Sequence, residues 1–128
     1  MAAWVYMLRC SDGSYYVGSH RGEDVTARVW EHQNGVYPKA YTFRRRPVEL
    51  VWSVFCEEIT DAIAFERKIK GWSRPKKEAL IRGDWGEVER LARGAKYVAP
   101  DLEARLAAAT ERDGAAVVLR PRPSTGSG

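Results

Sequence analysis

The chain has 128 residues, of which 45% are hydrophobic and 30% charged, as in a single globular domain, and no apolar run approaches the roughly 20 residues needed to cross a bilayer. Two cysteines and two histidines are too few for a disulfide framework or a structural zinc site, so we expect Cys10 and Cys56 to be reduced core residues. The net charge of +4 is concentrated in residues 39–77, which carry ten Lys or Arg against five Asp or Glu, and a basic middle favours a polyanionic partner.

The N-terminal residues are predicted to form a β-hairpin. Residues 4–10 are rich in aromatic and aliphatic side chains, residues 14–19 read as a second strand, and Ser11, Asp12 and Gly13 between them are typical of a turn. The chain thus enters a strand almost at once and lacks the charged start and long apolar segment of an export signal, so we expect a cytoplasmic protein.

The register of this hairpin decides which tyrosines share a face of the sheet. A two-residue turn would place Tyr6 and Tyr16 on opposite faces. A three-residue loop with Gly13 in the left-handed conformation pairs Leu8 with Tyr16 instead. We favour the second register, which puts Tyr6, Leu8, Tyr16 and Gly18 on one face.

A helix is predicted from an N-cap at Asp24 to a stop at Gly35. Arg28 and His32 lie four residues apart on this helix and therefore stand on the same face. After a polar loop, residues 48–56 form a third apolar strand that follows Pro47.

Glu66 breaks the pattern of the next predicted helix, which spans residues 59–72 with Thr60 as its N-cap. The apolar residues that recur there at helical spacing are Ala62, Ile63, Phe65 and Ile69. At about 100° per residue, Glu66 projects into the middle of their stripe. A buried carboxylate needs a metal ion, an arginine or a proton as its partner, because an unpaired buried charge is costly.

The remaining chain contains shorter elements. Residues 73–82 are predicted to form a basic helix, residues 84–93 a short third helix, and residues 101–112 an alanine-rich helix with a thin apolar face. The last nine residues are rich in Pro, Ser and Gly and are expected to be disordered. We therefore predict one domain over residues 1–97 and a C-terminal extension over residues 98–128.

The polar residues that interrupt the apolar pattern are Tyr6, Tyr16, Arg28, His32 and Glu66. In this order they resemble the GIY-YIG nuclease family over roughly residues 4–82, and the segments RRRPVELVW and WSRPKKEALI resemble its compact, stand-alone bacterial branch. The second signature reads Tyr16-Val17-Gly18. The first departs from the family pattern, with Trp4 and Val5 in the glycine and isoleucine positions, but it retains the tyrosine.

The resemblance implies an α+β fold, sandwich-like, in which a small three-stranded antiparallel sheet is flanked by α-helices. It also implies metal-dependent cleavage of phosphodiester bonds. Glu66 would bind a single Mg²⁺ or Mn²⁺ ion, which one carboxylate and the phosphate can hold, and Arg28 would neutralise charge on the phosphate. Tyr6 is favoured as the general base, directly or through His32, with Tyr16 positioning water or phosphate, but the sequence leaves the choice of tyrosine open.

Basic residues outside these motifs are candidates for contacts with nucleic acid, with DNA favoured over RNA. They are Arg44, Arg45, Arg46, Lys70, Arg74, Lys76 and Lys77. Tyr41, Phe43 and Trp72 lie among them and are candidates for stacking on unpaired bases. His20, which follows the second signature, is a further candidate to line the cleft.

The leading hypothesis is an endonuclease that acts on branched, damaged or single-stranded DNA in repair or recombination. A non-catalytic nucleic-acid-binding module is the alternative, because the first signature is altered. A third possibility is an adaptor that uses the predicted helix at residues 101–112. No essential protein partner and no membrane association are expected.

Overall fold

The computed structural model describes residues 2–22, 24–92, 105 and 118–119. Its elements in chain order are the strands and helices β1 (Ala3–Arg9), β2 (Tyr15–Arg21), α1 (Val25–Gln33), the 3-10 helix η1 (Phe43–Arg45), β3 (Glu49–Cys56), α2 (Ile59–Lys70), α3 (Arg74–Arg82), α4 (Trp85–Ala92) and β4 (Val118–Leu119). Among the described residues, no helix combines the length and apolar character needed to cross a membrane. The predicted helix at residues 101–112 and the predicted disorder of residues 120–128 lie outside the described residues, apart from Arg105.

The predicted hairpin register is confirmed. Leu8 pairs with Tyr16 and Tyr6 with Gly18, and Gly13 has a φ of 85° in the loop between the strands. Glycine suits this position because a left-handed backbone crowds the Cβ of other residues. Tyr6 and Tyr16 therefore lie on the same face of the sheet.

The sheet has the order β2-β1-β3-β4, with β1 antiparallel to both β2 and β3. This confirms the predicted three-stranded antiparallel sheet and adds a fourth strand of two residues, β4, parallel to β3. Strand β2 is thus one edge of the sheet. The two free cysteines are buried, as expected.

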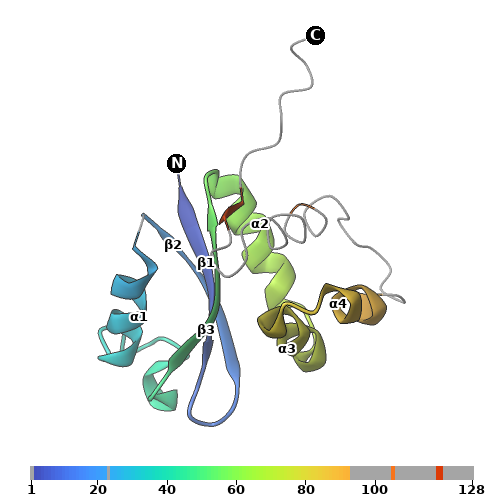
Figure 1. Ribbon diagram of the computed structural model, residues 1–128. Helices are drawn as coiled ribbons and strands as arrows, with labels where there is room; N and C mark the ends of the chain where they lie inside the picture. The colour runs from blue at the N-terminus through green and yellow to red at the C-terminus, as the bar shows by residue number, and fades with distance from the viewer. Residues whose placement is uncertain (1, 23, 93–104, 106–117, 120–128) are drawn as a thin grey trace.

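The sheet separates two layers of helix, as Figure 1 shows: α1 covers one face, whereas α2, α3 and α4 lie on the other. Alternation along β1 sends Tyr6 and Leu8 toward α1, where they pack with Val25. Val5 and Met7 point the other way, into the larger core that α2 and α3 complete.

Helix α1 has the predicted N-cap, since the Asp24 carboxylate accepts a hydrogen bond of 2.9 Å from the backbone N–H of Thr26. The predicted cap of α2 is wrong. Its N-cap is Glu58, because Ile59 already packs against the core as the first helical residue and Thr60 lies within the first turn. Helix α3 begins after Ser73, close to its predicted start.

Candidate active site

Tyr6 is at the centre of the candidate site. Its side chain is 1% exposed and its ring lies across Gly18, its partner on the edge strand β2. A Cβ atom on Gly18 would lie 2.6 Å from the Tyr6 hydroxyl and 2.9 Å from a ring carbon of Tyr16. The glycine of the second signature therefore makes room for Tyr6 to extend toward the edge of the sheet.

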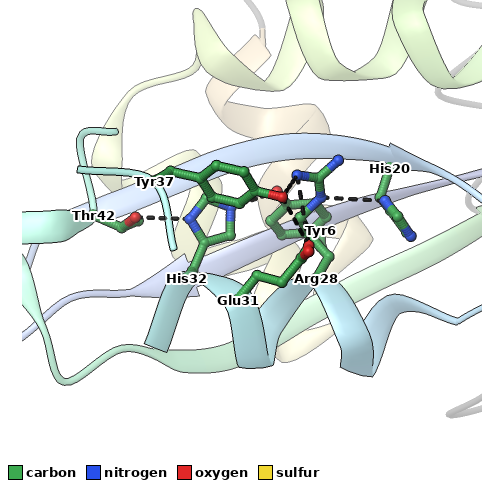
Figure 2. A network of polar contacts seen from close by, with 7 residues as sticks. All are labelled: Tyr6, His20, Arg28, Glu31, His32, Tyr37 and Thr42. Atoms are coloured by element: carbon green, nitrogen blue, oxygen red, sulfur yellow. Dashed lines mark hydrogen bonds and ion pairs between the residues drawn. The ribbon is translucent and has the colours of Figure 1, made fainter. Parts of the chain in front are cut away.

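Tyr6 begins a buried chain of polar contacts. Its hydroxyl lies 2.9 Å from Nε2 of His32, and Nδ1 of His32 lies 2.7 Å from Oγ1 of Thr42 (Figure 2). His32 and Thr42 are 4% and 1% exposed. Both ring nitrogens are therefore satisfied, which fixes the orientation of the imidazole between two hydroxyl groups.

His32 is held in its neutral form. Burial lowers the pKa of His32, and the positive charge of Arg28 lowers it further. A neutral imidazole has one nitrogen that can accept a proton, and the hydrogen bonds in the site can present that nitrogen to Tyr6 when Nδ1–H donates to Thr42.

Tyr6 is held in its protonated form. Burial is the largest cause of the raised pKa of Tyr6, followed by Tyr16. Arg28 lowers the pKa of Tyr6, but burial outweighs it. The Tyr6 hydroxyl therefore keeps its proton at neutral pH, and Nε2 of His32 is its hydrogen-bonding neighbour.

Arg28 is fixed at the mouth of the site by three neighbours. Its Nη1 donates to the hydroxyl of Tyr37 at 2.6 Å, and its Nε donates to Nδ1 of His20 at 3.2 Å. Glu31 accepts a hydrogen bond of 2.9 Å from Tyr37 and lies 3.8 Å from Nη1 of Arg28. Figure 2 shows these groups gathered above α1, beside the Tyr6–His32 pair. The guanidinium group is thus pre-oriented rather than free to rotate.

Tyr16 completes an aromatic cluster around His32. Its ring centroid lies 5.2 Å from that of His32, 6.2 Å from that of Tyr6 and 6.2 Å from that of Tyr41. The Tyr37 ring lies 5.6 Å from His32 on α1. The predicted residues Tyr6, Tyr16, Arg28 and His32 therefore come together on the α1 face.

Glu66 differs from its prediction. Its side chain is 22% exposed and lies on the flank of the buried stripe, because Ile63 is 39% exposed and only Ala62, Phe65 and Ile69 are buried. Glu66 is therefore not a core residue. Its Oε2 lies 3.5 Å from Nζ of Lys70, a surface pair of the kind that contributes little to stability.

Helix α2 packs on the face of the sheet opposite Tyr6, so Glu66 comes from the other side of the sheet than Tyr6. Its carboxylate is near enough to contribute to the raised pKa of Tyr6. Within the described part of the chain, no group of three or more His, Cys, Asp or Glu residues could hold a metal ion. A partly exposed single carboxylate fits a magnesium ion that takes its other ligands from phosphate and water.

Two hollows lie along the edge strand on either side of Gly18. One is lined by Ala3, Ser19, His20, Arg21, Arg28, Ile59, Ala62 and Ile63. The other is lined by Tyr15, Tyr16, Val17, Tyr41, Lys70 and Lys77. Each brings residues of α2 together with residues that precede β3, so the site opens along the edge of β2.

The three predicted arginines of the loop after α1 are in different environments. Arg44 is exposed. Arg45 pairs with Asp12 at 3.1 Å, and its guanidinium lies 3.7 Å from the centroid of the Tyr41 ring. Arg46 lies 4.5 Å from the centroid of Phe43.

The predicted cations of α3 diverge as well. Arg74 donates to the backbone oxygen of Gly13 at 2.6 Å and is exposed, and Lys77 lines the second hollow. Lys76 is only 7% exposed, with its Nζ 4.1 Å from the centroid of the Trp72 ring. The helix turns this position toward the core, so Lys76 is largely withdrawn from the surface, and its contact with nucleic acid stays a prediction.

Two residues of the polar network carry no signal in the sequence interpretation, namely Tyr37 and Thr42. Thr42 is buried against His32 only because the loop after α1 folds back over that helix. The position of Tyr37 soon after the end of the predicted helix is only a weak indication that it belongs to the site. His20 does line the cleft, which supports its weaker candidacy.

Comparison with known proteins gives three findings. A family model described as the GIY-YIG catalytic domain matches residues 2–79. UPF0213 proteins of Staphylococcus aureus strains Mu3 and Mu50 are each 44% identical over 79 residues, which is 62% of this chain and 93% of theirs. The solution NMR structure of a UPF0213 protein from Bacillus halodurans is 34% identical, with a TM-score of 0.42, and the match covers 72% of this chain and 98% of that chain.

Proposed function

Because this chain belongs to the GIY-YIG family, we propose that it is an endonuclease that hydrolyses phosphodiester bonds in DNA with the help of a divalent metal ion. The observation that carries the proposal is the buried chain from Tyr6 through His32 to Thr42, which ends at the open edge of the sheet beside Arg28. Such a chain can accept a proton from a nucleophile and pass it inward.

The departures from the first signature support an enzyme over a binding module that has lost cleavage. Val5 is fully buried in the core on the α2 face, and Trp4 packs on Phe55 with ring centroids 5.2 Å apart. Val5 lies on the face of the sheet opposite Tyr6, whereas Trp4 packs against the hydrophobic cluster that contains Tyr6. The altered positions are packing positions, and the chemical groups remain.

The proposed proton path uses the neutral imidazole. Water attacks the phosphorus atom and gives a proton to the Tyr6 oxygen, while the Tyr6 hydroxyl proton moves to Nε2 of His32 over the 2.9 Å hydrogen bond. The P–O bond to the leaving sugar oxygen breaks in the same step, and that oxygen takes a proton from solvent water. Nδ1–H continues to donate to Thr42, so the imidazolium that forms keeps both of its hydrogen bonds. No resting phenolate is required, which agrees with the raised pKa of Tyr6.

Arg28 faces the charge that develops on the phosphate, and its fixed guanidinium needs little reorganisation in the transition state. Glu66, with phosphate oxygens and water, is the residue that would hold a Mg²⁺ or Mn²⁺ ion, and such an ion supplies stabilisation of charge on the phosphate oxygens. Tyr16 is placed beside Tyr6 and His32 to position the phosphate or the attacking water.

A cleavage panel tests this proposal. Labelled single-stranded, flap, junction and duplex DNA would be incubated with Mg²⁺ or Mn²⁺ and with the wild type or Glu66→Ala across a broad pH range. We expect cleavage of at least one substrate by the wild type and none by the variant. An uncut panel, in the presence of intact folded protein, would refute the proposal, and wild-type activity in Glu66→Ala would remove Glu66 from the mechanism. A role in repair or recombination follows only if branched, damaged or single-stranded substrates are preferred.

A further inference from the structure

The second hollow on the edge strand has the chemistry of a nucleotide site. Its walls are Tyr15, Tyr16, Val17, Tyr41, Lys70 and Lys77, so three aromatic rings and two ammonium groups meet in one place. We call it the Tyr41 hollow. It shares Tyr16 with the candidate active site and therefore lies directly beside it.

Lys77 carries a charge in a partly dry position. It is half-buried on α3, and desolvation lowers its pKa. Among the described residues, no hydrogen-bond or ion-pair partner faces the Lys77 ammonium group. The nearby carboxylate of Glu78 already accepts a hydrogen bond from Tyr15 at 3.0 Å and pairs with Arg74 at 3.6 Å. A half-buried ammonium group without a counter-ion favours an anion from outside the protein.

Lys70 brings a second positive charge to the same hollow from α2. It is 51% exposed, and its contact with Glu66 at 3.5 Å is loose. Two ammonium groups from two helices can neutralise a phosphate together.

Tyr41 offers a fixed aromatic surface. Its side chain is 42% exposed, and its ring is held by the Arg45 guanidinium at 3.7 Å from the centroid. Arg45 in turn donates to Asp12 at 3.1 Å and to the backbone oxygen of Tyr41 at 2.9 Å. The ring is nearly parallel to that of Tyr16, with an angle of 18°. An exposed ring whose orientation is already fixed is a favourable platform for a nucleobase.

We propose that the Tyr41 hollow binds one unpaired nucleotide next to the scissile phosphate, with its phosphate between Lys70 and Lys77 and its base against Tyr41. This inference rests on the proposed function. A base inside a duplex is covered on both faces by its neighbours, so it must be unpaired to lie against Tyr41. The substrate class is therefore nucleic acid with at least one unpaired nucleotide at the cleavage site.

The test pairs changes in the protein with changes in a single-stranded DNA oligonucleotide. A methylphosphonate, which removes the charge of one phosphate, is placed at each position in turn, and an abasic residue removes one base at a time. Single-turnover cleavage with Mg²⁺ and equilibrium binding with Ca²⁺ are measured for the wild type, Lys77→Met and Tyr41→Leu. Lys39→Met is the matched control, because Lys39 is an exposed lysine outside both hollows.

For the wild type, we expect one methylphosphonate position next to the cleavage site to weaken cleavage and binding about 10- to 100-fold. With unmodified DNA, Lys77→Met should show a similar loss of cleavage and binding. With the methylphosphonate at that position, Lys77→Met should show no further loss. Tyr41→Leu should behave in the same way toward an abasic residue at the same nucleotide, with a loss of about 5- to 100-fold. Lys39→Met should match the wild type.

If the loss from the protein substitution and the loss from the DNA modification are fully additive, the proposed subsite is overturned. Variants that match the wild type would overturn it as well. If the wild type cleaves nothing, the proposed function fails, but the binding measurements still decide whether the subsite exists.

Discussion

Gly18→Ala should disrupt the candidate site without changing any of its chemical groups. The added methyl carbon would lie 2.6 Å from the Tyr6 hydroxyl, 2.8 Å from the adjoining ring carbon and 2.9 Å from a ring carbon of Tyr16. Both rings would have to move, and moving the Tyr6 hydroxyl from 2.6 Å to an ordinary contact of 3.4 Å takes it 0.8 Å from its present place. That shift strains or breaks its hydrogen bond to His32.

The magnitude follows from this geometry. Overpacking of a tight core costs about 1–3 kcal/mol, and weakening a hydrogen bond adds about 1 kcal/mol to the loss in the free energy of unfolding. Cleavage should fall further, by at least about 100-fold, because proton transfer depends on the placement of Tyr6.

Urea unfolding and single-turnover cleavage would measure the two effects. Gly86→Ala is the matched control, because the nearest atom to its added Cβ would be an Asp84 carboxylate oxygen at 3.7 Å, in the first turn of α4. This variant should be as stable and as active as the wild type. If Gly18→Ala also keeps full activity and stability, the close packing of Tyr6 on the edge strand is refuted.

Three further predictions concern the hydrogen bonds and the C-terminal contact. Tyr6→Phe should reduce the cleavage rate by at least about 100-fold and the free energy of unfolding by about 1–3 kcal/mol, because Nε2 of His32 loses its buried partner. A variant with wild-type turnover would exclude Tyr6 as the proton acceptor. Burial lowers the pKa of His32, so the cleavage rate should be maximal above pH 6.5 and fall with an acidic midpoint below that value. The unfolded state binds more protons in this range, so the free energy of unfolding should also be at its full value above pH 6.5 and decline as the pH falls, and a pH-independent rate between pH 5 and 7 would count against His32. Arg105→Met should lower the free energy of unfolding by about 2 kcal/mol, because Arg105 makes two hydrogen bonds of 2.8 and 3.2 Å to Asp61 and each side chain is only 16% exposed. An unchanged chemical unfolding curve would show that this pair contributes nothing to stability.

The β-hairpin could be predicted from the sequence because its determinants are local. Gly13 permits only a few turn geometries, and each geometry specifies which residues face each other across the strands. The same reasoning predicted that Tyr6 and Tyr16 share one face of the sheet. The helical spacing of Arg28 and His32 predicted that both stand on one side of α1.

The environment of Glu66 could not be predicted in this way. Helical periodicity treats the apolar stripe as uniformly buried, but Ile63, a member of this stripe on α2, is 39% exposed. Burial at an edge depends on the position of the helix relative to the strands, which periodicity does not contain. Glu66, with 22% of its side chain exposed, consequently lies at the border of the core rather than within it.

Contacts made by loops also could not be predicted from the sequence. Thr42 completes the hydrogen bonding of His32 from a loop whose path depends on tertiary packing, and Lys76 places its ammonium group over the Trp72 ring although it belongs to a charge run. The strand β4 has two residues, too few for any periodic pattern. These features arise from the assembled fold and not from local preference.

The most direct test of the central claim is single-turnover cleavage of a labelled single-stranded oligonucleotide by Glu66→Gln, beside the wild type and with Mg²⁺. The substitution keeps the size of the side chain and removes the charge, and circular dichroism would show that the fold is retained. The account predicts metal-dependent cleavage by the wild type and a loss of at least about 1000-fold in the variant, since a metal ligand and its charge are removed together. Equal rates for the two proteins, or wild-type cleavage that persists in a chelator of divalent metals, would contradict it.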